Sequence, residues 1–254
     1  MKQVNTPRGF GIIELLIVLA VAVVALALVF PTLAAARRSA RMSTSNTQLG
    51  GIHQGLVTWS QSNKRGGNDG YYPGLNSSGD VEPDGPLTGH SGDGAVPGAR
   101  LWIMLNGNFV TPEDIFNPRD NRTKKITRDP ATGIYPPVTH EDFSHAFQSL
   151  AGHPDERAEW VETLNTDAIV MGDHAIGSGS SDISSVWTGL KSGDWRGLIV
   201  RNDNSTGFQT DHVVTETKYA RAPVNPTDDI FEDDPAAADA FLVHEDATTA
   251  YSSN

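Results

Sequence analysis

The sequence predicts an α+β protein in which a long N-terminal helix packs on a C-terminal antiparallel sheet. Three observations predict this class. Residues 15–36 contain no Asp, Glu, Lys or Arg, residues 49–59 carry apolar side chains at helical spacing, and the strand-like runs come late in the chain. Helical segments followed by strands that pair with one another are typical of α+β proteins.

The uncharged stretch predicts a membrane helix over residues 10–36. At about 1.5 Å per residue, the part from Leu15 to Ala36 would span roughly 33 Å, enough for a bilayer core of about 30 Å. A helix that is apolar on every side has little use in a soluble fold. An ordinary secretory signal fits less well, because its apolar core runs only about 7–15 residues.

Glu14 lies one turn into this segment. A carboxylate near the membrane core costs several kcal/mol unless it is paired, so such a residue is by default a functional hypothesis. The alternative is that Glu14 caps the start of the helix, where the helix dipole favours an anion. Taken alone, the residue fits both interpretations.

The residues around Glu14 resemble a known processing signal. A short leader with two basic residues ends at Gly9, and Phe10 follows it. Glu14 lies four positions after Phe10, and an Ile/Leu/Val/Ala run comes next. This pattern is similar to the class III signal of type IV pilins and type II secretion pseudopilins. The resemblance implies that a membrane prepilin peptidase removes residues 1–9 and methylates Phe10. Gly11 departs from the family pattern, in which Thr is common at that position.

The resemblance also implies how copies of the chain would assemble. Glu14 would pair with the N-terminal amine of Phe10 in a neighbouring subunit, which agrees with the need of a buried carboxylate for a cation. Leu15 and Leu16 begin an apolar face that would pack against neighbouring helices. Pro31 marks either a bend of the kind that recurs in this family or an incidental kink.

The function that the resemblance implies is structural, with no catalytic role: a subunit of a type IV pilus or a type II secretion pseudopilus. Its partners would be further copies, other pilins, the prepilin peptidase, an inner-membrane assembly platform and, before assembly, membrane lipid. It would cross the bacterial inner membrane once and then enter a periplasmic or extracellular filament. The alternatives are a minor pilin or tip adhesin, with ligand-binding loops at 65–98 and 177–194, and a membrane-anchored protein of other function, for example an enzyme.

Residues 37–64 are predicted to continue the helix to about Asn63. Apolar side chains recur there at intervals of three, four and three residues, at Leu49, Ile52, Leu56 and Trp59. Each glycine in a helix costs about 1 kcal/mol relative to Ala, which predicts a break or loosening near Gly50-Gly51. The stretch from Ser43 to Gly74 resembles the second half of the helix in secretion-protein-G-like pseudopilins.

Residues 65–222 are predicted to form the globular domain, with residues 75–98 as a surface loop. The pattern predicts short helices over 101–105, 142–150 (capped by Thr139) and 155–164. It predicts strands over 168–171 and 213–219, and a hairpin formed by 195–201 and 206–210. Residues 223–254 are predicted to be an acidic tail, partly disordered or solvated.

Charge and composition narrow the functional classes. The net charge is −12, with +4 over residues 1–41 and −8 over residues 222–254. An acidic domain has no broad surface for phosphates, so we expect no nucleic-acid partner. The chain has no cysteine, which excludes disulfides and thiolate zinc sites.

The acidic residues near the C-terminus suggest a calcium loop, because Ca²⁺ takes six to eight oxygen ligands and several pseudopilins carry such a loop. The alternatives are a second pair, Asp173 with Asp182, and a plain solvated acidic face. His140 and His145 lack the spacing of the helical zinc motif, and the Gly/Ser run at 177–181 lacks the P-loop lysine. No cofactor other than calcium is expected. The calcium candidates are Asp228, Asp229, Glu232, Asp233 and Asp234.

Overall fold

The computed structural model describes residues 11–64, 70–82, 94–117, 119–151, 157–234, 239–246, 248 and 250–252. The chain divides into two compact units, Met1–Ser43 and Thr44–Asn254. The predicted cleavage site, Gly9-Phe10, lies outside the described residues.

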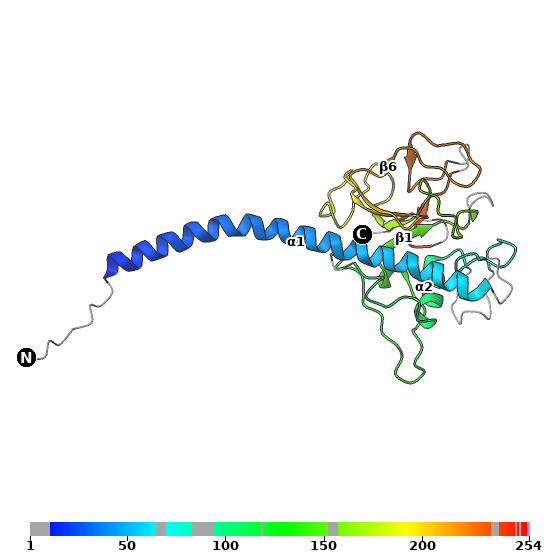
Figure 1. The fold of residues 1–254 in the computed structure, drawn as a ribbon, viewed down its shortest axis with the longest axis horizontal. Coiled ribbons are helices and arrows are strands. Elements are labelled where there is room, and N and C mark those ends of the chain that lie inside the picture. Colours follow the sequence, from blue (N-terminus) through cyan, green and yellow to red (C-terminus); the bar gives the residue numbers. More distant parts are fainter. Residues whose placement is uncertain are drawn as a thin grey trace, which may run out of the picture. The chain divides into compact units, whose positions relative to one another are not determined.

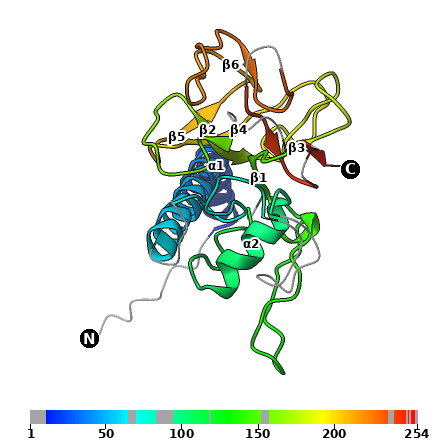
Figure 2. The same cartoon turned by 90° about the vertical axis from the view of Figure 1, so that its right-hand side faces the viewer.

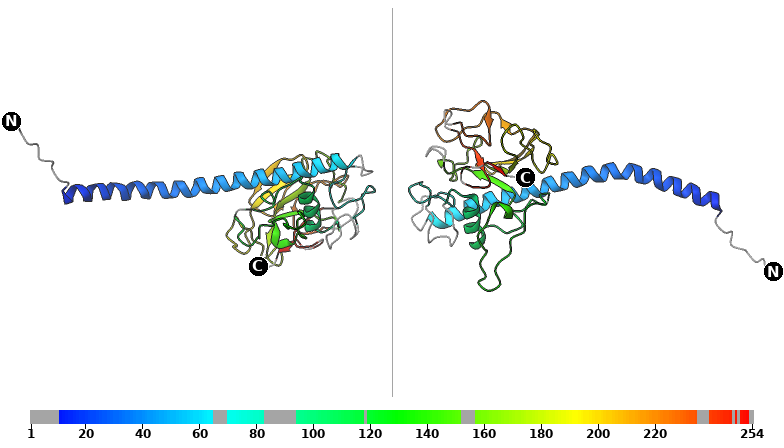
Figure 3. Two further views of the ribbon diagram at one scale, coloured as in Figure 1. Left: turned by 90° about the horizontal axis from the view of Figure 1, so that it is seen from below. Right: turned by 180° about the vertical axis from the view of Figure 1, so that it is seen from behind.

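One helix, α1 (Ile12–Asn63), contributes to both units and is unbroken in Figures 1 and 3. It is continuous through Pro31 and through Gly50-Gly51, so the predicted break at the glycines is wrong. The flanking Leu49 and Ile52 are both fully buried, and their packing outweighs the helical cost of the two glycines.

The second unit is built around a five-stranded antiparallel sheet in the order β5-β4-β2-β1-β8. Two smaller sheets accompany it, a parallel pair β3-β9 and an antiparallel pair β6-β7. The predicted α+β class is confirmed: the end of α1 packs on an antiparallel sheet. The strands are β1 (His145–Gln148), β2 (Ile169–Asp173), β3 (Ala175–Ile176), β4 (Gly197–Arg201), β5 (Thr206–Gln209), β6 (Val213–Val214), β7 (Asp228–Asp229), β8 (Leu242–Val243) and β9 (Tyr251–Ser252).

The main sheet is covered on both faces, which explains why β2 is buried along its whole length. On one face, α1 and α2 (Pro97–Asn106) pack against Phe147, Val170 and Leu198. On the other face, the segments around β6 and β7 pack against Ile169 and Ile199. Figure 2 shows α2 and β6 on opposite sides of the sheet.

Several predicted elements are confirmed. The hairpin is β4 and β5, in register from Gly197↔Gln209 to Val200↔Thr206. The short helix is α2, which extends the predicted 101–105 in both directions. The predicted strand at 168–171 is β2, shifted by one to two residues.

The helix predicted over 142–150 is wrong, because β1 lies within this segment and pairs with β2 on one side and with β8 on the other. The Thr139 cap exists, but it opens only a 3-10 turn over His140–Asp142. In the predicted helix over 155–164, Arg157 is the one helical residue among those described, and Val161 instead bridges Tyr71. The strand predicted over 213–219 shortens to β6, which pairs with β7 outside the main sheet.

The prediction of a tail over 223–254 is also wrong for the described part of that segment. It supplies β7, β8 and β9, and β8 is an edge strand of the main sheet beside β1. Ile230, Phe231 and Leu242 belong to the second core cluster. The acidic composition concealed these apolar positions.

Candidate functional site

Glu14 stands at the start of α1 and closes its first turn. The backbone N–H of Gly11 donates to Glu14 Oε2 at 2.9 Å, and the side chain is exposed. In the isolated chain Glu14 therefore satisfies a free N–H at the positive end of the helix, as the capping interpretation expects. The carboxylate remains open to a second partner.

The helix that follows exposes its large apolar side chains on all sides. Leu15 is 64% and Leu16 58% exposed, and all large apolar residues described from Ile12 to Leu33 are at least 41% exposed. The segment is long and apolar enough to cross a membrane, a test that an N-terminal signal sequence would also meet. A surface this apolar marks a contact with lipid or with protein.

The predicted calcium residues do not converge on one point. Asp228 is fully buried, Asp229 Oδ2 lies 3.4 Å from His212 Nε2, and Glu232 accepts a hydrogen bond from Ser180 Oγ. Asp233 and Asp234 are exposed. Among the described residues, no three His, Asp or Glu side chains are grouped so that they could hold a metal ion.

Asp173 and Asp182, the alternative calcium pair, also have separate hydrogen-bond partners. Asp173 is buried and accepts hydrogen bonds from Trp187 Nε1 and from the Leu198 N–H. Asp182 instead closes its own loop by accepting from the N–H groups of Ser178 and Gly179. Both carboxylates therefore act as structural acceptors in separate places.

Instead, Asp228 faces a residue that the sequence reasoning missed. Asp239 lies just before β8 and is also buried, and its carboxyl accepts from the Ala240 N–H and from Asn225 Nδ2. Neither oxygen of Asp228 has a hydrogen bond of regular geometry, although the Thr217 and Tyr219 hydroxyls face it together with Asp239. The signal in the sequence was an aspartate directly before the apolar run at 240–243.

Because Asp228 and Asp239 are buried and face each other, ionising both carboxyl groups would carry a large cost in free energy. Burial, followed by the charge of Asp228, raises the pKa of Asp239 to about 8. Burial also raises the pKa of Asp228. At neutral pH the pair therefore shares a proton.

The histidines at one end of the sheet are also structural. His174 donates through Nδ1 to the Ser144 carbonyl, stacks on His244 at 4.3 Å, and its Nε2 accepts from Arg122. Burial lowers the pKa of both histidines. Both rings are consequently neutral near pH 7, and the adjacent guanidinium disfavours a metal at His174 Nε2. His145 lies beside Asp173, with 3.5 Å between Nδ1 and Oδ1, and His140 lies near Glu245.

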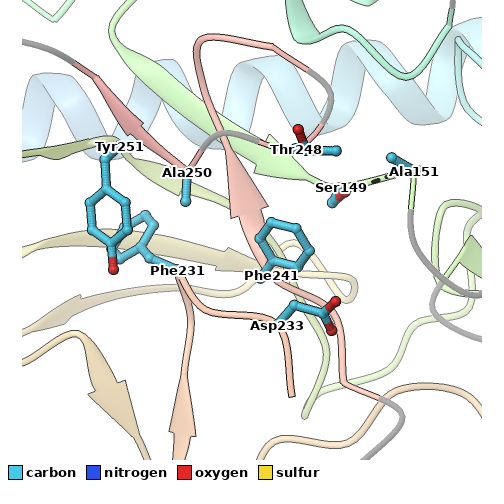
Figure 4. Close-up of a pocket in the computed structure, with 8 residues that line it drawn as sticks. All are labelled: Ser149, Ala151, Phe231, Asp233, Phe241, Thr248, Ala250 and Tyr251. Carbon is cyan, nitrogen blue, oxygen red and sulfur yellow. Dashed lines mark hydrogen bonds between the residues drawn. The ribbon is translucent and has the colours of Figure 1, made fainter. Parts of the chain in front are cut away.

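A hollow of about 520 Å³ opens beside β8 and β9 (Figure 4). Its floor is aromatic, from Phe231 and Phe241, which are themselves almost completely buried. Asp233 is the acidic group in the lining, and Figure 4 shows its carboxylate apart from the hydroxyl of Tyr251. No nucleophile-and-base pair is formed by the lining residues Ser149, Ala151, Phe231, Asp233, Phe241, Thr248, Ala250 and Tyr251.

Comparison with known proteins finds no matching family model, no matching curated protein and no matching solved structure. The start of α1 is the candidate functional region, because the sequence pattern and the exposed apolar surface coincide there.

Proposed function

We propose that this chain is a structural subunit of a pilin-like filament, either a type IV pilus or a type II secretion pseudopilus. One observation carries the proposal: the Gly-Phe-x₃-Glu pattern at residues 9–14 leads into the first turn of a helix whose apolar side chains are exposed on every side. An anchor requires the apolar helix alone, whereas a filament subunit also requires a processing site and an assembly carboxylate.

The exposed helix would have two successive environments. Lipid would surround residues 12–33 while the subunit waits in the inner membrane, with the acidic second unit outside the cytoplasm. In the filament, helices of neighbouring copies would replace the lipid. This exchange requires close van der Waals packing, because lipid tails are as apolar as the side chains they cover.

Glu14 would change partner during this exchange. In the isolated chain its carboxylate accepts from the Gly11 N–H. Cleavage after Gly9 would create an ammonium at Phe10, and a neighbouring copy would present that ammonium to Glu14. A charge-assisted pair in a low-dielectric helix bundle is strong and directional, so it would fix the axial register between copies.

The test is the mass of the intact chain and of its N-terminal peptide, in membrane and sheared-surface fractions of cells with an active prepilin peptidase. A chain that begins at methylated Phe10 and dominates the sheared fraction supports a major filament subunit. A processed chain confined to membranes supports a pseudopilus, and one that is scarce in filaments supports a minor pilin. An intact Met1 in all fractions contradicts the proposal and leaves a plain membrane anchor.

A further inference from the structure

Three arginines form a basic patch on α1 directly after the uncharged stretch. Arg37, Arg38 and Arg41 are all exposed. Residues three and four apart lie on the same side of a helix, so Arg41 stands beside both Arg37 and Arg38. The three guanidinium groups thus form one continuous surface, which is called the basic patch below.

No carboxylate on the same helix can neutralise the basic patch. Glu14 is the one acidic residue of α1, and it lies more than twenty positions before Arg37. The next acidic residue along the chain after the patch is Asp69. Helical ion pairs require a spacing of three or four residues, so the patch needs an anion from elsewhere.

The second unit carries the opposite charge in excess. Residues 44–254 contain 30 acidic and 14 basic residues, whereas residues 1–43 contain one acidic and five basic residues. Many of these acids are exposed, among them Asp167, Glu216, Glu232 and Asp233. Each copy of the chain therefore presents a compact cationic surface and a broad anionic one.

We propose that the basic patch binds the acidic surface of the second unit of another copy of this chain. The inference rests on the proposed filament function and names a contact within that filament. Two different surfaces of identical chains that bind one another form a heterologous contact, which repeats along a filament without closing. Guanidinium groups suit this role because their planar fork pairs with carboxylates in two parallel hydrogen bonds.

Lipid phosphate is the other anion available to a chain that waits in a membrane. Assembly withdraws the helix from lipid, and three guanidinium groups would then lose their phosphate partners. The acidic second units of neighbouring copies replace those partners in the filament. The observed charges therefore favour a second copy as the lasting partner of the patch.

The contact can be captured in full-length chain that has assembled in cells. The triple variant Arg37→Lys/Arg38→Lys/Arg41→Lys keeps the charge and supplies amines, which a zero-length carbodiimide joins to carboxylates in direct contact. We expect covalent dimers whose junction peptides link residues 37–41 to an acid of residues 44–254. The triple variant Arg37→Ala/Arg38→Ala/Arg41→Ala is the matched control and should lack those junctions, while the native lysines report equal coupling in both samples.

The functional arm uses charge reversal, Arg37→Glu/Arg38→Glu/Arg41→Glu. We expect about a tenfold or greater loss of filaments with unchanged cleavage and membrane abundance, because like charges at an interface cost several kcal/mol. Filaments of the triple-lysine variant that yield no such junctions, or reversal variants with normal filament yield, overturn the inference and leave the filament function intact. Normal filaments from a variant that has lost binding to anionic vesicles would assign the patch to lipid phosphate and also overturn it. Failure of the wild-type chain to form any filament rejects the proposed function itself.

Discussion

At the scale of single residues, the buried carboxyl pair shows how a strongly acidic segment joins a core. Asp228 and Asp239 are both removed from water, and neither oxygen of Asp228 has a hydrogen bond of regular geometry. A shared proton solves this problem, because it removes one charge and supplies one donor. The stability of this region is therefore linked to pH.

The sign of that linkage follows from the raised pKa. The pKa of Asp239 is about 8 in the folded chain, against an ordinary value of 3.8 for an aspartate. The folded state thus holds a proton that the unfolded state releases, so the contribution of Asp239 to the free energy of unfolding is greatest below pH 4. It falls as the pH rises toward 8, by at most about 1.4 kcal/mol per pH unit.

We predict that Asp239→Asn flattens this dependence and makes the chain more stable than wild type above pH 8. Tryptophan fluorescence in urea at pH 5, 7 and 9 measures the effect. Asp80→Asn, at an exposed site, is the matched control and should keep the wild-type slope. Parallel slopes for Asp239→Asn and wild type would contradict the shared proton, and the same series with added calcium tests whether a cation takes its place.

Glu14 would have two roles, capping and pairing, that substitutions can separate. Glu14→Ala should leave cleavage after Gly9 largely intact and reduce filament yield, because the ammonium of the neighbouring Phe10 loses its partner. Glu14→Gln separates the two roles of the residue, since the amide oxygen can still accept from the Gly11 N–H but carries no charge. Sheared-filament yield is the measurement. Normal yield from both variants would rule out the ammonium pair, and normal yield from Glu14→Gln alone would assign Glu14 to capping.

At the scale of elements, Gly55 in α1 has a packing role that its low helix propensity does not reveal. A methyl group on Gly55 would meet the Phe109 carbonyl oxygen at 2.7 Å and Val110 Cγ1 at 2.9 Å. Gly55 therefore allows α1 to approach the chain that follows α2. Gly51 is exposed, and its nearest neighbour would be Asp114 Oδ1 at 3.8 Å.

We predict opposite effects for two identical substitutions. Gly55→Ala should destabilise the fold by about 1–3 kcal/mol, because the clash with a carbonyl oxygen forces a backbone shift. Gly51→Ala should stabilise it by up to about 1 kcal/mol, because alanine is the better helix former. Urea unfolding of both variants measures the difference. Equal effects would mean that α1 does not approach residues 109–110 as closely as described.

Some strands could be predicted from the sequence and others could not. The hairpin β4-β5 could be predicted because its turn residues and apolar run are local signals. β1 could not, because His145–Gln148 is buried on both faces and has neither alternation nor a run of β-branched residues. β8 has two residues, and its pairing with β1 links positions almost a hundred residues apart, which no local pattern records.

The candidate site residues also differ in whether their signal is local in the sequence. The pattern around Glu14 is contiguous in sequence, so residue spacing was enough to select it. The partner of Asp228 depends on the tertiary position of Asp239, whereas the run Glu232–Asp234 was the companion that proximity in the sequence suggested. Contiguity along the chain favoured residues that the fold then separates.

At the scale of the whole molecule, the division into two units predicts how the chain can be cut. Residues 44–63 supply Leu49, Ile52, Leu56 and Val57 to the main core. A fragment of residues 44–254 keeps these side chains and loses the exposed apolar helix. A fragment of residues 64–254 loses all four, at a cost of roughly 1.5–3 kcal/mol for each large side chain.

We predict that the fragment 44–254 is a soluble monomer that unfolds cooperatively, whereas the fragment 64–254 does not fold. Light scattering on size exclusion, together with thermal unfolding, distinguishes the two. A folded 64–254 fragment would contradict the place of α1 in the core, and an aggregated 44–254 fragment would contradict the independence of the second unit.

The continuity of α1 has a mechanical consequence. Tension applied to residues 12–43 passes along unbroken backbone hydrogen bonds into residues 44–63, which are embedded in the core. The force then acts as shear along the whole contact between helix and sheet, where many side chains must slip at once. Unfolding the second unit by such a pull would require the buried side chains of residues 44–63 to leave the core together.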